Sequence, residues 1–394
     1  MNSWSDVCRQ CVATVAATPA WISLVSLLAT ALGVFVLDIV LTIDLSSFSS
    51  YSSLHPSHGL PCQKKRSTGP STKMDPSQPP QQLPCWSDAL DSAKQSSPSP
   101  AVEPAELFMS VVVPAFNEEE RLTDMLDEAV TYLENTYPSR ANAAVEIKPA
   151  RKRKTDNGHA KNGPATAPEA GRGWEIVIVS DGSTDRTEEV AFGFAKERKL
   201  EPGAFRVVSL TRNRGKGGAV THGMRHVRGQ YVVFADADGA SKFEDLGKLV
   251  AACSDVEDAE GRGVAVGSRA HMVGSEAVVK RSKLRNFLMH SFHLILWLMT
   301  PPKTATVKDT QCGFKLFSRA ALPYIVPYMH SEGWIFDVEM LMLAEFAHIP
   351  VAEVPVGWKE VGGSKLNVLR DSIGMAWGLA LLRASWSLGV YRQR

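Results

Sequence analysis

The chain has 394 residues, with 43 Lys and Arg against 42 Asp and Glu, so its net charge is +1. This balance gives no overall basic field, and we expect no nucleic-acid partner. Hydrophobic residues make up 44% of the chain and its six cysteines are scattered. This composition is typical of a globular protein without a disulfide framework, in a reducing compartment.

The most apolar stretch lies near the start of the sequence, at residues 20–43. Its first eighteen residues carry no charge, which is long enough to cross a bilayer. A secretory signal peptide is the alternative, but this run is longer than a normal signal h-region and Arg9 is the only basic residue before it. We therefore predict an N-terminal tail at residues 1–19 and an uncleaved transmembrane helix, a signal-anchor, at residues 20–43.

Two segments have a composition that cannot form a packed core. Residues 44–105 are rich in Ser, Pro and Gln and bury too little apolar surface to offset chain entropy. They predict a flexible tether between the anchor and a folded domain. Residues 138–173, which include the run "RKRK", predict a low-complexity loop insertion at the surface of that domain.

Between and after these segments, apolar runs alternate with helical patterns. Strands are predicted at residues 107–116, 174–182, 205–210 and 230–238, and helices at 117–137, 183–199 and 215–227. This alternation predicts an α/β domain over 106–367, with a Rossmann-like, mostly parallel sheet flanked by helices. In such sheets ligands bind beyond the carboxyl ends of the strands. The polar segments there are "PAFNEEE", "SDGSTD", "TRNRGKGG" and "DADGA", and we expect them to form one site.

The segment "DADGA" places two carboxylates, Asp236 and Asp238, at the end of an apolar strand. Held close together they would repel, so a cation is expected between them. Mg²⁺ or Mn²⁺, shared with a substrate diphosphate, is the natural choice for oxygen ligands. A solvated Asp pair in a capped turn is the alternative, since this short motif is common by chance.

Two further segments have chemistry suited to a nucleotide. Asp181 can accept hydrogen bonds from a base or a ribose, and Gly182 would let a ligand approach the backbone closely; alternatively, Asp181 caps the next helix in an Asx-turn. In "TRNRGKGG", glycines open a helix beside Lys216 and two arginines, which suits phosphate. The alternative is a basic surface turn. Neither a P-loop nor a dinucleotide fingerprint occurs.

The order and identity of these motifs resemble a known family. "VVVPAFNEEERL", "IVSDGSTD", "NRGKGGAV", "ADADGA", "VGSRAH", "DTQCGFKLF", "WIFDVEML" and "EVGGSKL" resemble segments of the dolichyl-phosphate β-glucosyltransferases, across residues 107–368. These enzymes belong to the inverting glycosyltransferase family 2 and have a GT-A fold.

The resemblance implies transfer of glucose from UDP-glucose to dolichyl phosphate with inversion. The product would be dolichyl β-D-glucosyl phosphate, the lipid glucose donor for N-glycan precursor assembly. It also implies a divalent cation and a place in the endoplasmic reticulum membrane, with a single N-terminal anchor, contact with membrane lipid and the catalytic domain facing the cytosol.

The resemblance also assigns roles to residues. It implies nucleotide-sugar contacts by Pro114, Phe116, Asn117, Glu118, Asp181, Gly182, Lys216 and Asp236, and metal ligation by Asp236 and Asp238. It implies acceptor-phosphate contacts by Arg281, Arg285, Ser364 and Lys365, with Arg269 as a further phosphate clamp. Two positions depart from related patterns: Ser180 stands where many members have Asp, and Ala240 where mannose synthases have Gln.

Asp309 matches the acidic residue often called the catalytic base, which together with Asp238 and Arg269 gives the expected catalytic set. A phosphate monoester has a second pKa of about 6, so the acceptor is already mostly dianionic at neutral pH. Two roles for Asp309 therefore stay open: a base, or a group that orients the sugar or stabilises positive charge on its ring. Cys312 is expected to be a small buried side chain rather than a nucleophile.

Two apolar stretches follow the predicted site, at residues 284–300 and 372–394. Each could lie in the lipid headgroup region and guide a polyprenyl chain, or could be a core-packing helix. Residues 368–394 are predicted to be an amphipathic, membrane-associated segment.

Two rival functions remain. One is a dolichyl-phosphate mannose synthase that uses GDP-mannose; the other is an inactive, membrane-tethered nucleotide-sugar-binding protein.

Overall fold

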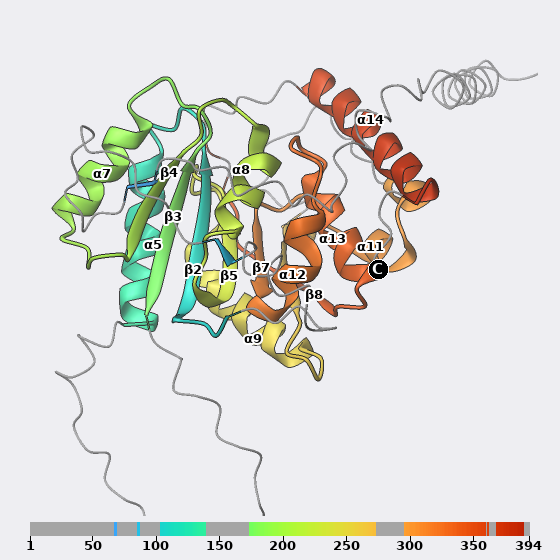
Figure 1. Ribbon diagram of the computed structural model, residues 1–394, viewed down its shortest axis with the longest axis horizontal. Helices are drawn as coiled ribbons and strands as arrows, with labels where there is room; N and C mark the ends of the chain where they lie inside the picture. Colours follow the sequence, from blue (N-terminus) through green and yellow to red (C-terminus); the bar gives the residue numbers. More distant parts are fainter. Residues whose placement is uncertain are drawn as a thin grey trace, which may run out of the picture. The chain divides into compact units, whose positions relative to one another are not determined.

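The computed structural model describes residues 67–68, 85–86, 103–138, 173–272, 295–359, 361 and 368–389 (Figure 1). The predicted anchor at 20–43, and Arg281, Arg285, Ser364 and Lys365, lie outside these residues. Within them, no helix is long and apolar enough to cross a bilayer. The centre is a mixed, mostly parallel sheet in the order β1-β4-β3-β2-β5-β7-β6-β8; β1 is only the two-residue edge strand Ser67–Thr68.

The parallel part of the sheet consists of the four strands expected from the sequence. These are β2 (Leu107–Ala115), β3 (Trp174–Ser180), β4 (Phe205–Ser209) and β5 (Gly229–Ala235). β2 pairs in parallel with both β3 and β5, and β3 with β4. All seven residues of β3 are buried, as expected for a strand covered by helices on both faces. The predicted parallel α/β core is confirmed.

The helices cover both faces of this sheet. One hydrophobic cluster joins it to α5 (Leu122–Thr136), α7 (Thr187–Glu197) and α9 (Leu246–Val256). The other joins it to α8 (Gly215–Met224), α12 (Leu322–Ile325) and α13 (Phe336–Phe346). Short helical segments complete the fold at η1 (Phe243–Asp245), η2 (Ala270–Met272), α11 (Pro302–Thr306), η3 (Arg319–Ala321) and η4 (Val326–Tyr328).

The rest of the sheet breaks the parallel pattern. β7 (Phe314–Ser318) is antiparallel to β5 and to β6 (Val264–Ser268), while β6 pairs in parallel with β8 (Val351–Pro355). Because β7 runs in the opposite direction to β5, its first residue, Phe314, lies opposite Ala235. The loop before β7 therefore meets the carboxyl end of β5.

Two helices begin later than their sequence pattern predicts. α5 starts at Leu122 and α7 at Thr187, whereas the patterns run from residues 117 and 183. The cause is that residues 117–121 and 183–187 bind each other: Thr184 N donates to Asn117 Oδ1 at 2.8 Å and Glu119 N to Asp185 Oδ2 at 3.1 Å. These side chains accept hydrogen bonds from backbone N–H groups of the loops, so the loop conformation is favoured over a longer helix.

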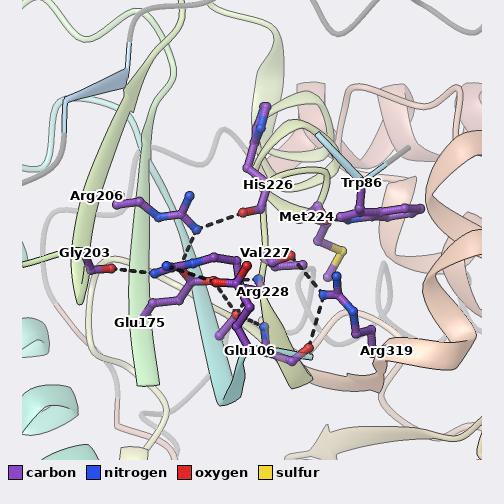
Figure 2. A network of polar contacts seen from close by, with 12 residues as sticks. Trp86, Glu106, Glu175, Gly203, Arg206, Met224, His226, Val227, Arg228 and Arg319 are labelled. Carbon is purple, nitrogen blue, oxygen red and sulfur yellow. Dashed lines mark hydrogen bonds and ion pairs between the residues drawn. The ribbon is translucent and has the colours of Figure 1, made fainter. Parts of the chain in front are cut away.

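A glutamate is buried at the amino ends of the parallel strands, far along the strands from the predicted site. Glu175 is fully buried and accepts hydrogen bonds from Ser110 Oγ at 2.6 Å and from Arg228 N at 2.7 Å. Arg206 and Arg228 form ion pairs with its carboxylate, and Figure 2 shows both guanidinium groups converging on it. Because the buried charge is paired and hydrogen-bonded, it can join β2, β3, β4 and the turn before β5.

Residues 85–86 attach part of the predicted tether to the domain. Trp86 is 5% exposed and belongs to the hydrophobic cluster on the α8 face. Its Nε1 donates to Met224 O at 2.6 Å (Figure 2), and its backbone N donates to Arg225 O at 3.2 Å. Together with β1, which pairs with β4, this contact gives the Ser- and Pro-rich segment two fixed points among its described residues.

We expect Trp86→Ala to lower the free energy of unfolding by about 3–5 kcal/mol, since it removes a buried aromatic ring and leaves a cavity. Trp86→Phe keeps most of the packing and loses the bond to Met224 O, at an expected cost of about 1–2 kcal/mol. Denaturant unfolding of the full chain, followed by intrinsic fluorescence, measures both changes. An unaltered midpoint for Trp86→Ala would mean that this residue is not packed in the domain.

The C-terminal helix α14 (Val368–Ser387) lies beside α13 (Figure 1). Leu379 and Leu382 are buried in a cluster with Leu296 and with Val338 and Met342 of α13. This packing agrees with the core-helix interpretation for one side of α14. Its other side and residues 297–298 expose large apolar groups: Trp297, Leu298, Ile373, Trp377 and, just after the helix, Leu388.

Candidate active site at the carboxyl ends of the parallel strands

The polar segments that follow the parallel strands lie together. Asp181 N donates to Ala115 O and Leu210 N to Ser180 O, both at 2.8 Å. Arg214 N donates to Asp181 Oδ1 at 2.7 Å. These bonds join the ends of β2, β3 and β4, as the sequence predicts for parallel strands.

The segment after β2 is held by the loop after β3. Asn117 has a φ of 55°, and its N donates to Ser183 Oγ at 3.1 Å. Glu118 forms an ion pair with Arg121 at 2.6 Å, and its N donates to Thr187 Oγ1 at 2.8 Å. Asn117 and Glu118, two of the predicted nucleotide contacts, therefore also hold the two loops together.

The other two predicted contacts of this segment differ in position. Pro114 lies within β2, paired with Val179 of β3. Phe116 follows the strand and is 38% exposed, which is unusual for a large aromatic side chain. Of the two, Phe116 has the ring surface on which a planar base could stack.

Asp181 and Gly182 hold the glycine-rich segment in place. Gly182 has a φ of 69°, and a Cβ there would lie 2.7 Å from Asn213 N. Burial raises the pKa of Asp181, although the backbone N–H groups of Arg214 and Gly215 oppose the shift. The loop itself thus requires a glycine at 182, and its contact with a ligand stays a prediction.

The glycines of "GKGG" fit against the loop 331–333. A Cβ would lie 2.5 Å from Glu332 O at Gly215 and 2.5 Å from Ser331 O at Gly217. Gly218 N donates to Glu332 O at 3.2 Å. This packing explains the small residues at the start of α8 and shows that they face protein backbone as well as any phosphate.

Lys216 points from α8 to the end of β5. Its Nζ lies 2.6 Å from Asp236 Oδ1 and 5.9 Å from the ring centroid of Trp334. Burial lowers the pKa of Lys216, but the carboxylates of Asp236 and Asp337 outweigh burial and raise it above its ordinary value. The ammonium is therefore charged at neutral pH and lies directly beside the aspartate pair.

Asp236 and Asp238 follow β5 as predicted. Ala240 N donates to Asp238 Oδ1 at 3.0 Å. Burial first, and then the charge of Asp236, raise the pKa of Asp238, so the nearby cations do not fully compensate the pair. A divalent cation would balance the remaining negative charge, and the carboxylates are the hard oxygen donors that it prefers.

The protein offers few other metal ligands at this position. Among the described residues, no cluster of three or more His, Cys, Asp or Glu side chains forms a metal site. Asp236 and Asp238 would therefore supply two carboxylates, and the remaining positions would fall to substrate oxygens and water. Mg²⁺ and Mn²⁺ are commonly bound in this way.

Gly313 leaves room for the carboxylate of Asp236. A Cβ at Gly313 would lie 2.0 Å from Asp236 Oδ2, and Asp236 N donates to Gly313 O at 3.2 Å. The contact explains why a glycine precedes β7, which runs antiparallel to β5. It also fixes the distance between the metal-site candidate and the loop that carries Asp309.

We expect Gly313→Ala to lower the rate of the reaction about 100-fold, because the methyl group must displace the Asp236 carboxylate by around 1 Å. Gly193→Ala is the matched control, since a Cβ at that position in α7 meets nothing within 4 Å. It should leave the rate unchanged and stabilise the fold by about 0.5–1 kcal/mol. Steady-state rates and thermal unfolding of both variants test this; equal rates would place Asp236 outside the site.

Arg269 and Asp309 form a bidentate pair at the opposite side of β5. Arg269 Nε donates to Asp309 Oδ2 at 2.7 Å and Nη2 to Oδ1 at 2.9 Å, and Arg269 N donates to Oδ2 at 2.9 Å. Burial alone would raise the pKa of Asp309, but these bonds and the guanidinium charge hold it below its ordinary value. Asp309 is thus a stable carboxylate with both oxygens engaged, which is unfavourable for a base.

Two buried charges in the site have no role predicted from the sequence. Lys315 in β7 is fully buried and forms an ion pair with Asp337 of α13, which is 3% exposed. The sequence does contain a signal for these buried charges, because each is a charged residue inside an apolar run, in "GFKLF" and "WIFDVEML". Cys312 is fully buried, as expected, and burial raises the pKa of its thiol to about 11.

Comparison with known proteins gives consistent matches. The family described as "Glycosyl transferase family 2" matches residues 168–323. The chain is 45% identical over 294 residues to a dolichyl-phosphate beta-glucosyltransferase of Saccharomyces cerevisiae, covering 73% of this chain and 77% of that protein. Proteins of the same description match from Drosophila melanogaster (39% over 287 residues; 73% and 77% covered) and Homo sapiens (38% over 285 residues; 72% and 77% covered).

Among solved structures, the chain is similar to glucosyl-3-phosphoglycerate synthase from Mycobacterium tuberculosis in complex with Mn²⁺, UDP-glucose and phosphoglyceric acid. The sequence identity is 17% and the TM-score is 0.46. The alignment covers 76% of this chain and 83% of that one.

Proposed function

The chain belongs to the dolichyl-phosphate β-glucosyltransferase family, and we propose that it transfers glucose from UDP-glucose to dolichyl phosphate with inversion. The product would be dolichyl β-D-glucosyl phosphate. The observation that carries this proposal is the charge arrangement at the end of β5: Asp236 and Asp238 lie beside the ammonium of Lys216. A nucleoside diphosphate and a divalent cation together would balance these charges.

The acceptor needs little activation. Its phosphate monoester has a second pKa of about 6 and is mostly dianionic at neutral pH. The protein's task is therefore to position the phosphate oxygen in line with the anomeric carbon and to screen two approaching phosphates. Arg269 lies beside Asp309 and within electrostatic range of Asp236, so we assign it to this screening.

Departure of UDP needs stabilisation of the diphosphate. A divalent cation held by Asp236 and Asp238 would neutralise charge on the leaving group. Lys216, at 2.6 Å from Asp236, adds a fixed positive charge at the same position. Phe116 and Asp181 remain the proposed contacts for the nucleoside, with Asp181 acting also through the loop that it anchors.

Asp309 is assigned to charge stabilisation rather than to proton abstraction. Its lowered pKa makes it a weak base, whereas a permanent carboxylate suits the positive charge that develops on the sugar ring. Arg281, Arg285, Ser364 and Lys365 remain proposed contacts of the acceptor phosphate.

We further propose that residues 20–43 anchor the enzyme in the endoplasmic reticulum membrane, with the catalytic domain facing the cytosol. The exposed apolar side chains of residues 297–298 and of α14 support contact with membrane lipid. Tryptophan is common at the lipid headgroup level, and here Trp297 is 66% and Trp377 is 43% exposed. A lipid acceptor would reach the site from this surface.

The test is transfer of labelled sugar to dolichyl phosphate by membranes that contain the full chain. UDP-glucose and GDP-mannose are compared side by side, with and without EDTA. Glucosyl-lipid that depends on the metal supports the proposal. Formation of mannosyl-lipid would mean that the donor is GDP-mannose. Binding of UDP-glucose without any lipid product would indicate an inactive sugar-nucleotide-binding protein.

A further inference from the structure

Lys315 is a fully buried lysine behind the segments that form the site. Its Nζ donates to the carboxylate of Asp337 and, at 2.7 Å, to Cys312 O. It also lies 5.2 Å from the ring centroid of Phe234. Burial of an ammonium costs several kcal/mol unless partners compensate it, so a lysine is an unfavourable choice here if its only task is to fill space.

The partners of Lys315 belong to three segments: two carry the proposed catalytic groups Asp309 and Asp236, and the third contacts Lys216. Cys312 lies in the loop between Asp309 and Gly313, and Gly313 packs against Asp236. Phe234 lies in β5, two residues before Asp236. Asp337 lies in α13 directly after Phe336. The ring centroid of Phe336 lies 6.0 Å from Lys216 Nζ.

Asp337 forms an ion pair with Lys315 and is also influenced by the charge of Lys216. Burial raises its pKa, and the positive charges of Lys315 and then Lys216 oppose that shift. In turn, the carboxylates of Asp236 and Asp337 both favour the charged form of Lys216. Two ion pairs, Lys315–Asp337 and Lys216–Asp236, thus lie near each other, with Phe336 of α13 between Asp337 and Lys216.

We propose that Lys315 is a positioning residue for glucosyl transfer: through Asp337 it fixes the ammonium of Lys216 at the donor diphosphate, and through Cys312 O it fixes the loop before β7 against Asp236. This inference rests on the proposed function. It follows that Lys315 does not touch substrate; its effect on the donor passes through Asp337 and Lys216. Without the Lys315–Asp337 pair, Lys216 would lose the second carboxylate that supports its charge beside Asp236.

The chemistry of a buried pair provides a way to separate positioning from folding. Replacing both partners by uncharged residues is often neutral for stability, whereas removing one leaves an unpaired buried charge. We therefore compare Lys315→Met, Lys315→Arg and the double variant Lys315→Met with Asp337→Asn in the full chain. Lys196→Met, at an exposed position of α7, is the matched control.

The double variant is expected to unfold near the temperature of the unsubstituted protein. It should raise the KM for UDP-glucose about tenfold and lower kcat about tenfold, since a small displacement of a charged group has effects of this size. The KM for dolichyl phosphate should stay within about twofold. Lys315→Arg should recover most of the activity, and Lys196→Met should match the unsubstituted enzyme.

The outcomes are distinguishable. Partial unfolding lowers the apparent kcat but leaves both KM values unchanged, because the folded molecules that remain are normal. A folded double variant with an unchanged KM for UDP-glucose would therefore overturn the positioning role. Absence of glucosyl-lipid from the unsubstituted protein would instead reject the proposed function. Binding of UDP with Mn²⁺, measured by calorimetry, gives a second readout and should weaken about tenfold in the double variant.

Discussion

Asp238→Asn is expected to reduce kcat for glucosyl transfer by about a thousandfold, the size typical of losing a group that stabilises charge in the transition state. Asp238 follows β5 next to Asp236 and provides one of only two carboxylates proposed for the divalent cation. An asparagine keeps the size and the oxygen that accepts from Ala240 N, but removes the negative charge. Initial rates with saturating Mg²⁺ or Mn²⁺ measure the loss.

Stability provides an internal check on this prediction. Burial and the charge of Asp236 raise the pKa of Asp238, so its ionised form is disfavoured in the folded protein without metal. A raised carboxyl pKa lowers stability as the pH rises past the unfolded value. Asp238→Asn should therefore unfold at the same or a higher temperature without metal, and Mn²⁺ should no longer raise that temperature.

Asp255→Asn, at an exposed position of α9, is the matched control and should retain both the rate and the response to Mn²⁺. If Asp238→Asn kept a normal rate, or if Mn²⁺ still stabilised it as much as the unsubstituted protein, the metal would have to bind elsewhere.

The sequence predicts the parallel half of the fold because its pattern is local. β2, β3, β4 and β5 are short apolar runs, each ended by polar residues, and each lies within a few residues of its predicted range. β7 and β6 are different: which strand pairs with β5, and in which direction, depends on contacts between residues about eighty positions apart. No periodicity in the sequence gives that direction.

The site divides in the same way. Asp236 and Asp238 are predicted from a strand end and a charge argument, since both signals lie within five residues. The pairing of Arg269 with Asp309 joins residues forty positions apart, and neither motif by itself predicts it. Its consequence is chemical: the same Asp309 that a family motif describes as a base has a lowered pKa here.

Trp86 and Gly182 show how tertiary contacts override composition. The segment around Trp86 has the composition of a linker, yet a single large ring gains enough burial to dock on α8. Gly182 is predicted to let a ligand approach the backbone, and its left-handed φ and the short distance from a Cβ there to Asn213 N show that the loop requires a glycine as well. In both cases the partner is distant in sequence, so local reasoning could not identify it.

Asp309→Asn is expected to lower kcat about 100-fold, by loss of a charge that stabilises the transition state, without moving the acid limb of the pH–rate profile. With its pKa held below the ordinary value by Arg269, Asp309 stays ionised throughout the neutral range. The acid limb should instead lie at about pH 6, where the acceptor phosphate takes up a proton. Profiles of kcat/KM for dolichyl phosphate from pH 5 to 9 test this.

Two further measurements make the interpretation decisive. The stabilising effect of the Arg269–Asp309 pair is present above the unfolded carboxyl pKa and is lost as the pH falls through the lower folded value. The free energy of unfolding of Asp309 variants should therefore differ from that of the unsubstituted protein at neutral pH. In strong acid the two values should converge. Arg269→Lys keeps the charge but not the bidentate geometry, and should lower kcat with an unchanged acid limb. If Asp309→Asn instead abolished or shifted that limb, Asp309 would be the proton acceptor, and the lowered pKa would have to rise when substrate binds.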